Sequence, residues 1–388
     1  MYIHSIQKVI YKDPWQSDFY ERLNSLKKGE GRVAYYYEKP DSSTFRYRVY
    51  NMIQAISESP INISSSYFWG NELEKHDEII SNTDVIVICR ARYTAQLSKF
   101  ISIARNKGKL IFFDIDDFIF NPSFTHLVVD TLNYDLNNPI TSDFWFSFIA
   151  QEYASINLCD YVITTNSFIA EQIIQLTGKK TFVVPNFLNR EQYELSVKII
   201  ESKKNNGFLR NNKFHLGYFS GSPTHTKDLG VAFDAIIELL TKFKNLNLRI
   251  VGYMGLHKAF KQFPSQIERY PMQDYLNLQR IIGDVELNLI PLQDNIFTNC
   301  KSELKFFEAG ITGTVSIASP IFSYANSIVD GKNGFLCKSH QWFELIESFI
   351  NDPKSLENIA LEAKTTSEEK FLWKNHSNAI INILFPNS

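Results

Sequence analysis

Cysteine is scarce in this sequence. Only four cysteines occur among 388 residues, and no two of them are close together. This spacing excludes a disulfide framework and a zinc site built from cysteine pairs, and it fits a reducing compartment. We therefore expect a cytoplasmic protein. The four residues are Cys89, Cys159, Cys300 and Cys337.

The sequence also lacks a basic excess and a long apolar run. Lysine and arginine number 40 against 42 aspartate and glutamate residues, so we expect no nucleic acid partner. No stretch reaches the roughly 18 apolar residues of a membrane-spanning helix, and the first residues lack the apolar core of a signal peptide. We therefore expect no membrane span and no leader, and at most peripheral contact with the inner face of a membrane.

Aromatic residues, in contrast, are abundant at 14% of the chain. We expect most of them to fill the core. Trp15, Phe19 and Tyr20, followed by Lys27 and Lys28, offer the alternative of a face that meets a membrane surface. The sequence leaves both interpretations open.

The length and the alternation of the chain predict two α/β domains. A chain of 388 residues, 44% hydrophobic and 21% charged, is typical of a globular protein with more than one core. Short β-rich runs alternate with amphipathic stretches, a pattern typical of parallel sheets. In the first half we expect strands over 32–37, 84–89, 109–115, 160–164 and 181–184, and helices over 46–57, 92–106, 142–157 and 167–176.

The apolar pattern is lost in a stretch rich in lysine and asparagine, ESKKNNGFLRNNK, and then restarts. We predict a first domain over 1–195, a linker over 196–213, a second domain over 214–370 and a final helix over 371–388 that packs back on the first domain. In the second domain we expect strands over 214–219, 248–251, 266–270, 285–290 and 314–318, and helices over 227–243 and 302–309.

One turn in the second half has the chemistry of a diphosphate site. An apolar strand ends in Ser220-Gly221-Ser222-Pro223 and leads into a helix. Glycine allows a ligand to approach the backbone, and a helix amino terminus attracts an anion. The Ser222 hydroxyl and the Lys227 ammonium would add to that field, and His225 in the same turn is a further candidate for contact with the diphosphate. The alternative is an ordinary tight connection between a strand and a helix.

A short helix further along offers a second cluster. Lys301, Lys305 and Glu308 are spaced so that they share one helix face. At the carboxyl edge of a parallel sheet these groups could hold a ribose diol and a diphosphate together. The alternative is a solvated face with a Lys305–Glu308 ion pair, which would contribute little.

The order of the motifs resembles the donor half of family 4 glycosyltransferases. The segments are GYFSGSPTHTKD, LRIVG, NLIPL, KSELKFFEAG, SIASP and IVDGKNGFL. They look most like a bacterial subgroup that builds surface polysaccharides. The resemblance covers about 214–349, while the first half resembles the family only in architecture.

The resemblance implies a GT-B fold, in which two Rossmann-like domains face each other across a central cleft, and a nucleotide-sugar donor held without a metal or other cofactor. It implies that Glu308 binds the donor ribose and that Gly221 and Lys227 bind the diphosphate, with Ser222 near the family's usual arginine. The family has a glutamate eight positions before the ribose-binding one, where this chain has Cys300. Lys301, Ser302 and Lys305 are the expected substitutes, Asn299 is expected to line the sugar pocket, and Arg269 and Tyr270 to lie near the nucleobase.

The segment KLIFFDIDDFIFNP allows three interpretations. Asp114, Asp116 and Asp117 after an apolar strand resemble the nucleophile loop of haloacid-dehalogenase phosphatases, and also the metal site of GT-A glycosyltransferases. In a GT-B fold this strand instead ends at the cleft, where Asp116 and Asp117 could orient or deprotonate the acceptor hydroxyl. These aspartates could also merely cap a loop or pair with arginines.

Arg46 and Arg48 begin a helix near the first strand. They could pair with these aspartates, hold an anionic acceptor, or belong to a solvated helix start. The resulting hypothesis is a hexosyltransferase, retaining as the family implies, that moves a sugar from a nucleoside-diphosphate sugar to a hydroxyl of a glycan or lipid-linked glycan during surface polysaccharide synthesis. The rivals are a sugar-nucleotide epimerase, a phosphatase and a non-catalytic nucleotide- or glycan-binding protein.

Overall fold

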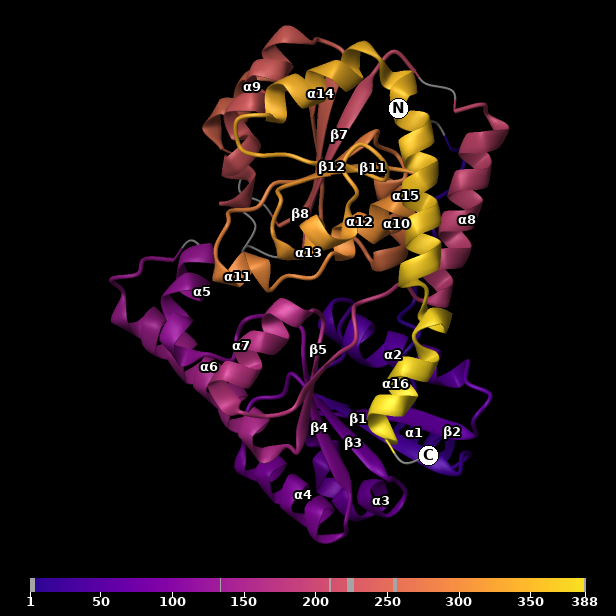
Figure 1. The fold of residues 1–388 in the computed structure, drawn as a ribbon, viewed down its shortest axis with the longest axis vertical. Helices are drawn as coiled ribbons and strands as arrows, with labels where there is room; N and C mark the ends of the chain where they lie inside the picture. The colour runs from indigo at the N-terminus through magenta and orange to yellow at the C-terminus, as the bar shows by residue number, and fades with distance from the viewer. Residues whose placement is uncertain (1–3, 133, 209–210, 222–226, 254–256, 387–388) are drawn as a thin grey trace.

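The computed structural model describes residues 4–132, 134–208, 211–221, 227–253 and 257–386. Two α/β halves lie end to end along the long axis of the molecule (Figure 1). Each half contains a six-stranded sheet in which every strand pairs in parallel with its neighbours.

The first sheet has the order β2-β1-β3-β4-β5-β6. Its inner strands are mainly apolar because helices cover both faces. All five residues of β3 are buried. The strands are β1 (Gly31–Tyr37), β2 (Ile63–Trp69), β3 (Val85–Cys89), β4 (Leu110–Ile115), β5 (Tyr161–Thr164) and β6 (Thr181–Val183). The helices are α1 (Phe19–Leu26), α2 (Asn51–Ser57), α3 (His76–Ser81), α4 (Ala95–Asn106), α5 (Thr125–Thr131), α6 (Pro139–Leu158) and α7 (Ser167–Thr177).

The second sheet has the order β12-β11-β10-β7-β8-β9, so the chain starts in the middle, builds one side and then the other. The strands are β7 (Phe214–Ser220), β8 (Leu246–Gly252), β9 (Ile267–Tyr270), β10 (Leu287–Ile290), β11 (Val315–Ala318) and β12 (Phe335–Leu336). The helices are α9 (Phe233–Lys242), α10 (Tyr275–Ile282), α11 (Ile296–Asn299), α12 (Leu304–Gly310), α13 (Phe322–Ser327) and α14 (Trp342–Asn351). The predicted architecture of two Rossmann-like domains is confirmed.

The segment predicted as a linker is largely helical. Helix α8 (Arg190–Asn205) runs beside the second half and makes a buried contact there, where Lys203 Nζ donates to the carbonyl oxygen of Thr312 at 2.8 Å. The apolar face of this helix is narrow, which is why the lysine-rich sequence resembles a loop. Two strands, β2 and β12, and several helices were also absent from the sequence prediction.

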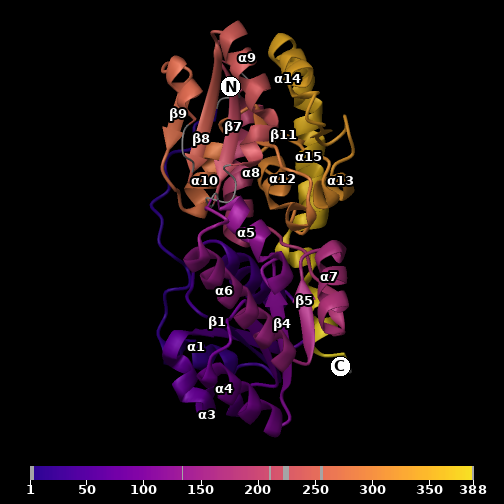
Figure 2. The same cartoon turned by 90° about the vertical axis from the view of Figure 1, so that its left-hand side faces the viewer.

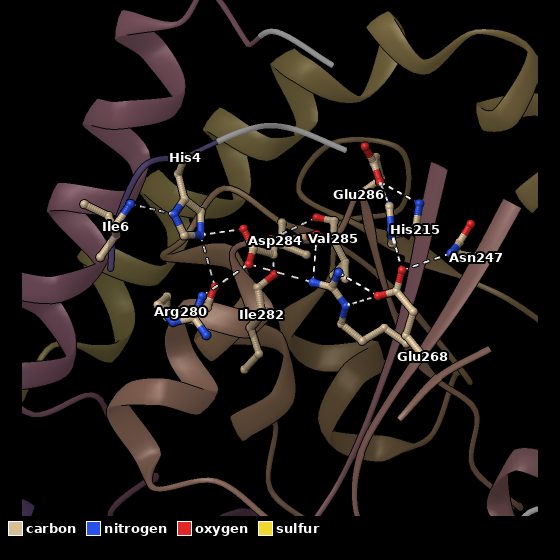
Figure 3. Close-up of polar contacts among 12 residues, drawn as sticks. His4, Ile6, His215, Asn247, Glu268, Arg280, Ile282, Asp284, Val285 and Glu286 are labelled. Carbon is tan, nitrogen blue, oxygen red and sulfur yellow. Dashed lines mark hydrogen bonds and ion pairs between the residues drawn. The ribbon is translucent and has the colours of Figure 1, made fainter. Parts of the chain in front are cut away.

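Both ends of the chain cross between the halves. The amino-terminal segment leaves the first half and reaches the second (Figure 2), where the Val9 amide donates to Asn277 Oδ1 at 3.0 Å. His4 Nε2 lies 2.8 Å from Asp284 Oδ1, at the edge of a buried polar network that extends to His215 (Figure 3). In the opposite direction, α15 (Leu356–Phe371) leads to α16 (Ser377–Leu384), which packs on α2.

The aromatic residues near the start of the chain do not form one exposed face, which favours core filling over the membrane-facing alternative. Trp15 and Phe19 are buried, at 3% and 7% exposure, although Tyr20 is exposed. Exposed apolar side chains gather instead at the start of α6, including Ile140 and Phe144. No helix in the described part of the chain is long and apolar enough to cross a membrane.

Candidate functional site

The turn after β7 lies at the topological switch point of the second sheet. Strands β7 and β10 are neighbours, and the chain leaves them toward opposite sides of the sheet. Ligands of open α/β sheets bind outside the carboxyl ends of the strands at such a point. Gly221 directly follows β7, whereas Ser222 and His225 lie outside the described residues.

Lys227 marks the far end of this turn and reaches the other half. Its Nζ lies 2.5 Å from Asp130 Oδ1 on α5. The predicted helix over 227–243 is a 3₁₀ turn, Asp228–Ala232, followed by α9. Asp228 anchors the turn to the end of β10, because its Oδ1 accepts from the Gln293 amide at 3.3 Å.

Lys305 lies on α12 near the same switch point. Its Nζ is 5.6 Å from the ring centre of Tyr218 on β7. Burial lowers the pKa of Lys305 to about 8, an effect that Asp228 partly opposes. A buried ammonium is poorly hydrated, so an anionic ligand stabilises it more than the same ligand would stabilise an ammonium exposed to solvent.

Glu308 is buried between the halves, at 5% exposure. Its Oε1 accepts hydrogen bonds from the Tyr47 hydroxyl, from Arg46 Nη2 at 3.3 Å and from Gln192 Nε2 at 3.1 Å. Burial raises the pKa of Tyr47 well above its usual value, so this hydroxyl keeps its proton and acts as a donor. The predicted ribose-binding carboxylate is therefore held by residues of the first half and of α8.

Arg46 is the cation of this network. It donates to Gln192 Oε1 at 2.8 Å, and its guanidinium lies over the rings of Tyr47 and Tyr275. Arg46 is 4% exposed, so it does not belong to a solvated helix start. We define Arg46, Tyr47, Gln192 and Glu308 as the interdomain network.

The other predicted donor contacts are distributed around this centre. Ser302 Oγ accepts from Asn186 Nδ2 at 3.0 Å, and Asn299 Oδ1 accepts from the Phe322 amide at 2.8 Å. Lys301 Nζ lies 4.6 Å from the ring centre of Phe297. Arg269 and Tyr270 end β9, which is separated from β7 by β8.

Asp116 and Asp117 follow β4 in the first half. Asp116 Oδ1 lies 3.2 Å from Arg90 Nη1, and its Oδ2 accepts from Thr44 Oγ1 at 3.2 Å. Asp117 Oδ1 accepts from the Phe118 amide at 2.9 Å. The arginine that pairs with Asp116 is thus Arg90, and neither Arg46 nor Arg48.

Arg48 and Asp114 form a separate, fully buried pair. The guanidinium contacts both carboxylate oxygens, at 2.8 and 3.0 Å, and also donates to the Val184 carbonyl and to Asn186 Oδ1. Burial raises the pKa of Asp114 to about 6, although Arg48 opposes this shift. The pair holds β4 to the segment after β6, and Arg48 is fully buried, so it offers no surface to an acceptor.

Sequence reasoning missed Tyr47, Gln192 and Arg90. Each is a polar residue in an otherwise ordinary segment, and its partner lies far away in sequence. Arg90 alone carries a local signal in the structure, a φ of 42°. In the described part of the chain, no group of three or more His, Cys, Asp or Glu side chains is arranged to hold a metal ion.

Comparison with known proteins supports the fold. No family model and no curated protein matches the sequence. Among solved structures, the chain is similar to the Anabaena protein HepE in complex with UDP and glucose, with 14% identity, 91% of this chain and 98% of that chain covered, and a TM-score of 0.58.

Two further solved structures have the same architecture. Sucrose-phosphate synthase from Thermosynechococcus elongatus shows 11% identity, coverage of 92% of this chain and 99% of that chain, and a TM-score of 0.60. A glycosyltransferase from Rickettsia africae shows 13% identity, coverage of 92% and 99%, and a TM-score of 0.59. The chain has the GT-B fold.

Proposed function

We propose that this GT-B chain is a glycosyltransferase that moves a sugar from a nucleoside-diphosphate sugar to a hydroxyl of a glycan or lipid-linked glycan. The observation that carries the proposal is the position of Lys305 beside Tyr218 of β7, at the switch point of the second sheet, where the charges of Asp228 and Glu308 act on it. Gly221 directly follows β7, Lys227 and Lys305 provide positive charge, and Glu308 provides a carboxylate for the ribose.

A uridine nucleotide is the first donor to test. HepE was solved with UDP-glucose, and Staphylococcus aureus TarM in complex with UDP. Both support a UDP-sugar as the donor of this chain. In the proposal, Arg269 and Tyr270 contact the base, and Asn299, Lys301 and Ser302 contact the sugar once the two halves separate enough to free them.

The proposed reaction replaces one bond at the anomeric carbon by another. The bond to the diphosphate oxygen breaks, and the nucleoside diphosphate leaves with the electron pair. The acceptor oxygen bonds to the anomeric carbon, and its proton passes to Asp116 or Asp117. Positive charge from Lys227 and Lys305 stabilises the charge that develops on the diphosphate, which is where preorganised electrostatics contribute most. Retention of configuration and a role in surface polysaccharide synthesis rest on the family resemblance.

One observation argues against the phosphatase alternative. Asp114 occupies the nucleophile position of that hypothesis, yet it is completely buried and paired with Arg48. A non-catalytic nucleotide- or glycan-binding protein remains the second candidate, because Cys300 replaces a family glutamate and is itself buried. An epimerase would use the donor site without an acceptor, so product analysis with the donor alone separates it from a transferase.

Peripheral membrane contact is part of the proposal, at the start of α6. Ile140 is 80% exposed and Phe144 57% exposed, and the same helix continues to Glu152, close to Asp116. A bilayer that accepted these side chains would present a lipid-linked acceptor near the cleft. The acceptor is therefore proposed to approach along α6.

The test is ligand-induced stabilisation with UDP, GDP, dTDP, CDP and CMP. A nucleotide that binds the folded chain raises the free energy of unfolding by mass action, by about 2.7 kcal/mol at a hundredfold excess over Kd, and the unfolding temperature rises with it. We expect one nucleotide, UDP first, to stabilise the chain, and Glu308→Gln to remove most of this effect. Glu286→Gln, a buried carboxylate at the amino end of β10, is the matched control. No stabilisation by any nucleotide would contradict the donor site.

A further inference from the structure

A second polar cluster lies at the switch point of the first sheet. Strands β1 and β3 are neighbours there, and the chain leaves them toward opposite sides. Arg90 follows β3, and its Nη1 donates to Thr44 Oγ1 at 2.7 Å and lies 3.2 Å from Asp116 Oδ1. Thr44 in turn donates to Asp116 Oδ2, which closes a triangle of three side chains. None of the proposed donor contacts uses this cluster, and Asp116 enters the proposed function only as a group that takes the acceptor's proton.

The backbone of Arg90 is unusual for a bulky residue. Its φ of 42° falls in the left-handed region that favours glycine. Such conformations persist where the surroundings hold them, and they concentrate at ligand sites. Here the Arg90 amide donates to the Asp114 carbonyl at 2.8 Å, which fixes the turn so that the guanidinium reaches Asp116. The Arg90 side chain stays 25% exposed.

Glu152 on α6 adds a buried carboxyl group to the cluster. It is 1% exposed, and its Oε2 has no hydrogen-bond partner in the described part of the chain. The charged groups that act on it are Arg90, Glu38, Arg92 and Asp116. Burial raises the pKa of Glu152 to about 8, so the side chain carries a proton at neutral pH. When Glu152 is protonated, the Arg90 guanidinium pairs with Asp116 alone, whereas ionised Glu152 would compete with Asp116 for this guanidinium.

The charges of the cluster are paired internally. Arg90 pairs with Asp116, and Arg92 contacts both oxygens of Glu38, at 2.9 and 2.7 Å. An anionic ligand would therefore have to displace a carboxylate from an arginine. A neutral sugar would not, since its hydroxyls can both donate to Asp116 and accept from Arg90.

We propose that Arg90 and Asp116 form an acceptor subsite for a neutral sugar, which they bind through neighbouring hydroxyls, and that Glu152 is a positioning residue for Arg90. The proposal rests on the glycosyltransferase function and specifies its acceptor class. Asp116 accepts a hydrogen bond from the sugar hydroxyl that attacks the donor, and Arg90 donates a hydrogen bond to the oxygen of the neighbouring hydroxyl. Glu152 does not touch the sugar.

The first experiment measures glycoside binding to the full chain by saturation-transfer NMR, with the methyl α-glycosides of glucose, galactose and mannose and with methyl glucuronide as the anionic probe. We expect at least one neutral glycoside to bind, and Arg90→Met and Asp116→Asn to weaken it at least tenfold. Arg105→Gln is the matched control, because Arg105 pairs with Asp160 at the opposite edge of the same sheet. Binding that survives in Arg90→Met and Asp116→Asn, absence of neutral glycoside binding, or a preference for the glucuronide would overturn the subsite.

Nucleotide stabilisation separates this proposal from the donor site. Arg90→Met and Asp116→Asn should keep the stabilisation by the nucleotide that the wild-type chain selects, which also shows that they fold. If the wild-type chain responds to no nucleotide, the glycosyltransferase function fails. If the nucleotide response is intact and the glycoside response is unchanged by Arg90→Met, only the subsite fails.

The positioning role of Glu152 predicts a pH profile. In the wild-type chain, glycoside affinity should fall severalfold as pH rises from 7 to 9, because ionised Glu152 draws Arg90 away from Asp116. Glu152→Gln cannot ionise and should give a flat profile over this range with affinity near that of the wild type at pH 7. An equal fall in both proteins would overturn the positioning role.

Discussion

Replacing Glu308 by alanine is expected to destabilise the folded chain by about 3 kcal/mol. The carboxylate is 5% exposed and accepts from Tyr47, Arg46 and Gln192. Its removal leaves the Arg46 guanidinium buried without an anion, and loss of one partner from a buried ion pair typically costs about 3–5 kcal/mol. We expect the lower end, because Arg46 keeps hydrogen bonds to Gln192 Oε1 and to the Ser42 carbonyl.

The assay is urea unfolding of a double-mutant cycle. Glu308→Leu and Arg46→Met each remove one member of the pair, and the double variant removes both. Because contacting residues couple by roughly 0.5–3 kcal/mol, the double variant should be more stable than the sum of the single losses predicts. Arg105→Gln serves as the control, since an exposed pair of this kind contributes only about 0.2–1 kcal/mol.

A cost below about 1 kcal/mol for Glu308→Ala, together with no coupling to Arg46, would refute the reasoning. It would mean that the interdomain network does not hold the two halves together in solution. A large cost has a practical consequence for the donor-site test. Loss of nucleotide stabilisation in Glu308→Ala could follow from damage to the fold, which is why the donor site is tested with Glu308→Gln, a variant that keeps the side-chain volume and one acceptor.

Three further expectations follow from burial and exposure. Lys305 has a pKa lowered to about 8, and a bound diphosphate favours its charged form. Binding of a nucleoside diphosphate should therefore take up a proton above pH 8, and Lys305→Gln should abolish this uptake. Calorimetry in buffers of different ionisation enthalpy measures it. Burial also lowers the pKa of Lys203 to about 8, so the folded state disfavours the charged form of this lysine. The wild-type chain should therefore gain stability between pH 8 and pH 10 relative to Lys203→Met. Urea unfolding that gives the same change in the free energy of unfolding for both proteins between these pH values would contradict the shift. Ile140→Ser with Phe144→Ser should weaken flotation with phosphatidylcholine vesicles, whereas Ile174→Ser, an exposed isoleucine on α7, should not; equal flotation of both variants would exclude contact at α6.

The sequence predicted the strands best where burial is continuous. In β3 and β4 nearly every residue is buried, so an apolar run marks each strand, and only Asp114 in β4 interrupts it. Strand β2 begins Ile-Ser-Ser-Ser, which breaks the apolar pattern, and it forms because its backbone pairs with β1 along its whole length. Pairing of this kind involves distant segments and leaves little local signal.

In the candidate site, too, the sequence predicts residues that belong to a local motif but not their partners from distant segments. The resemblance predicts a ribose-binding role for Glu308 because its neighbours in sequence form a recognisable motif. Tyr47 and Arg46, which hold that carboxylate, lie in the other half of the chain, in a segment that reads only as the start of a helix. The pairing of Asp116 with Arg90 was missed for the same reason, since only the adjacency of β3 and β4 brings the two together.

The position of Cys300 bears on how a donor could enter. Cys300 and Phe297 pack within a hydrophobic cluster formed mainly by the first half, and the carbonyl oxygen of Cys300 accepts from Asn166 Nδ2 at 3.2 Å. Where the family has a glutamate for the sugar, this chain therefore has a contact between its halves. Lys227 and Ser302 are likewise engaged across the interface, by Asp130 and Asn186.

These contacts and the donor compete for the same groups. The Lys227–Asp130 pair is partly exposed on both sides, so its rupture costs little. The interdomain network around Glu308 is buried and costs more to open. We therefore expect the halves to separate first at the Lys227 edge, and the network around Glu308 to open only after that edge has opened. A diphosphate that binds Lys227 would compensate for the lost aspartate, so the donor itself would favour the opened edge.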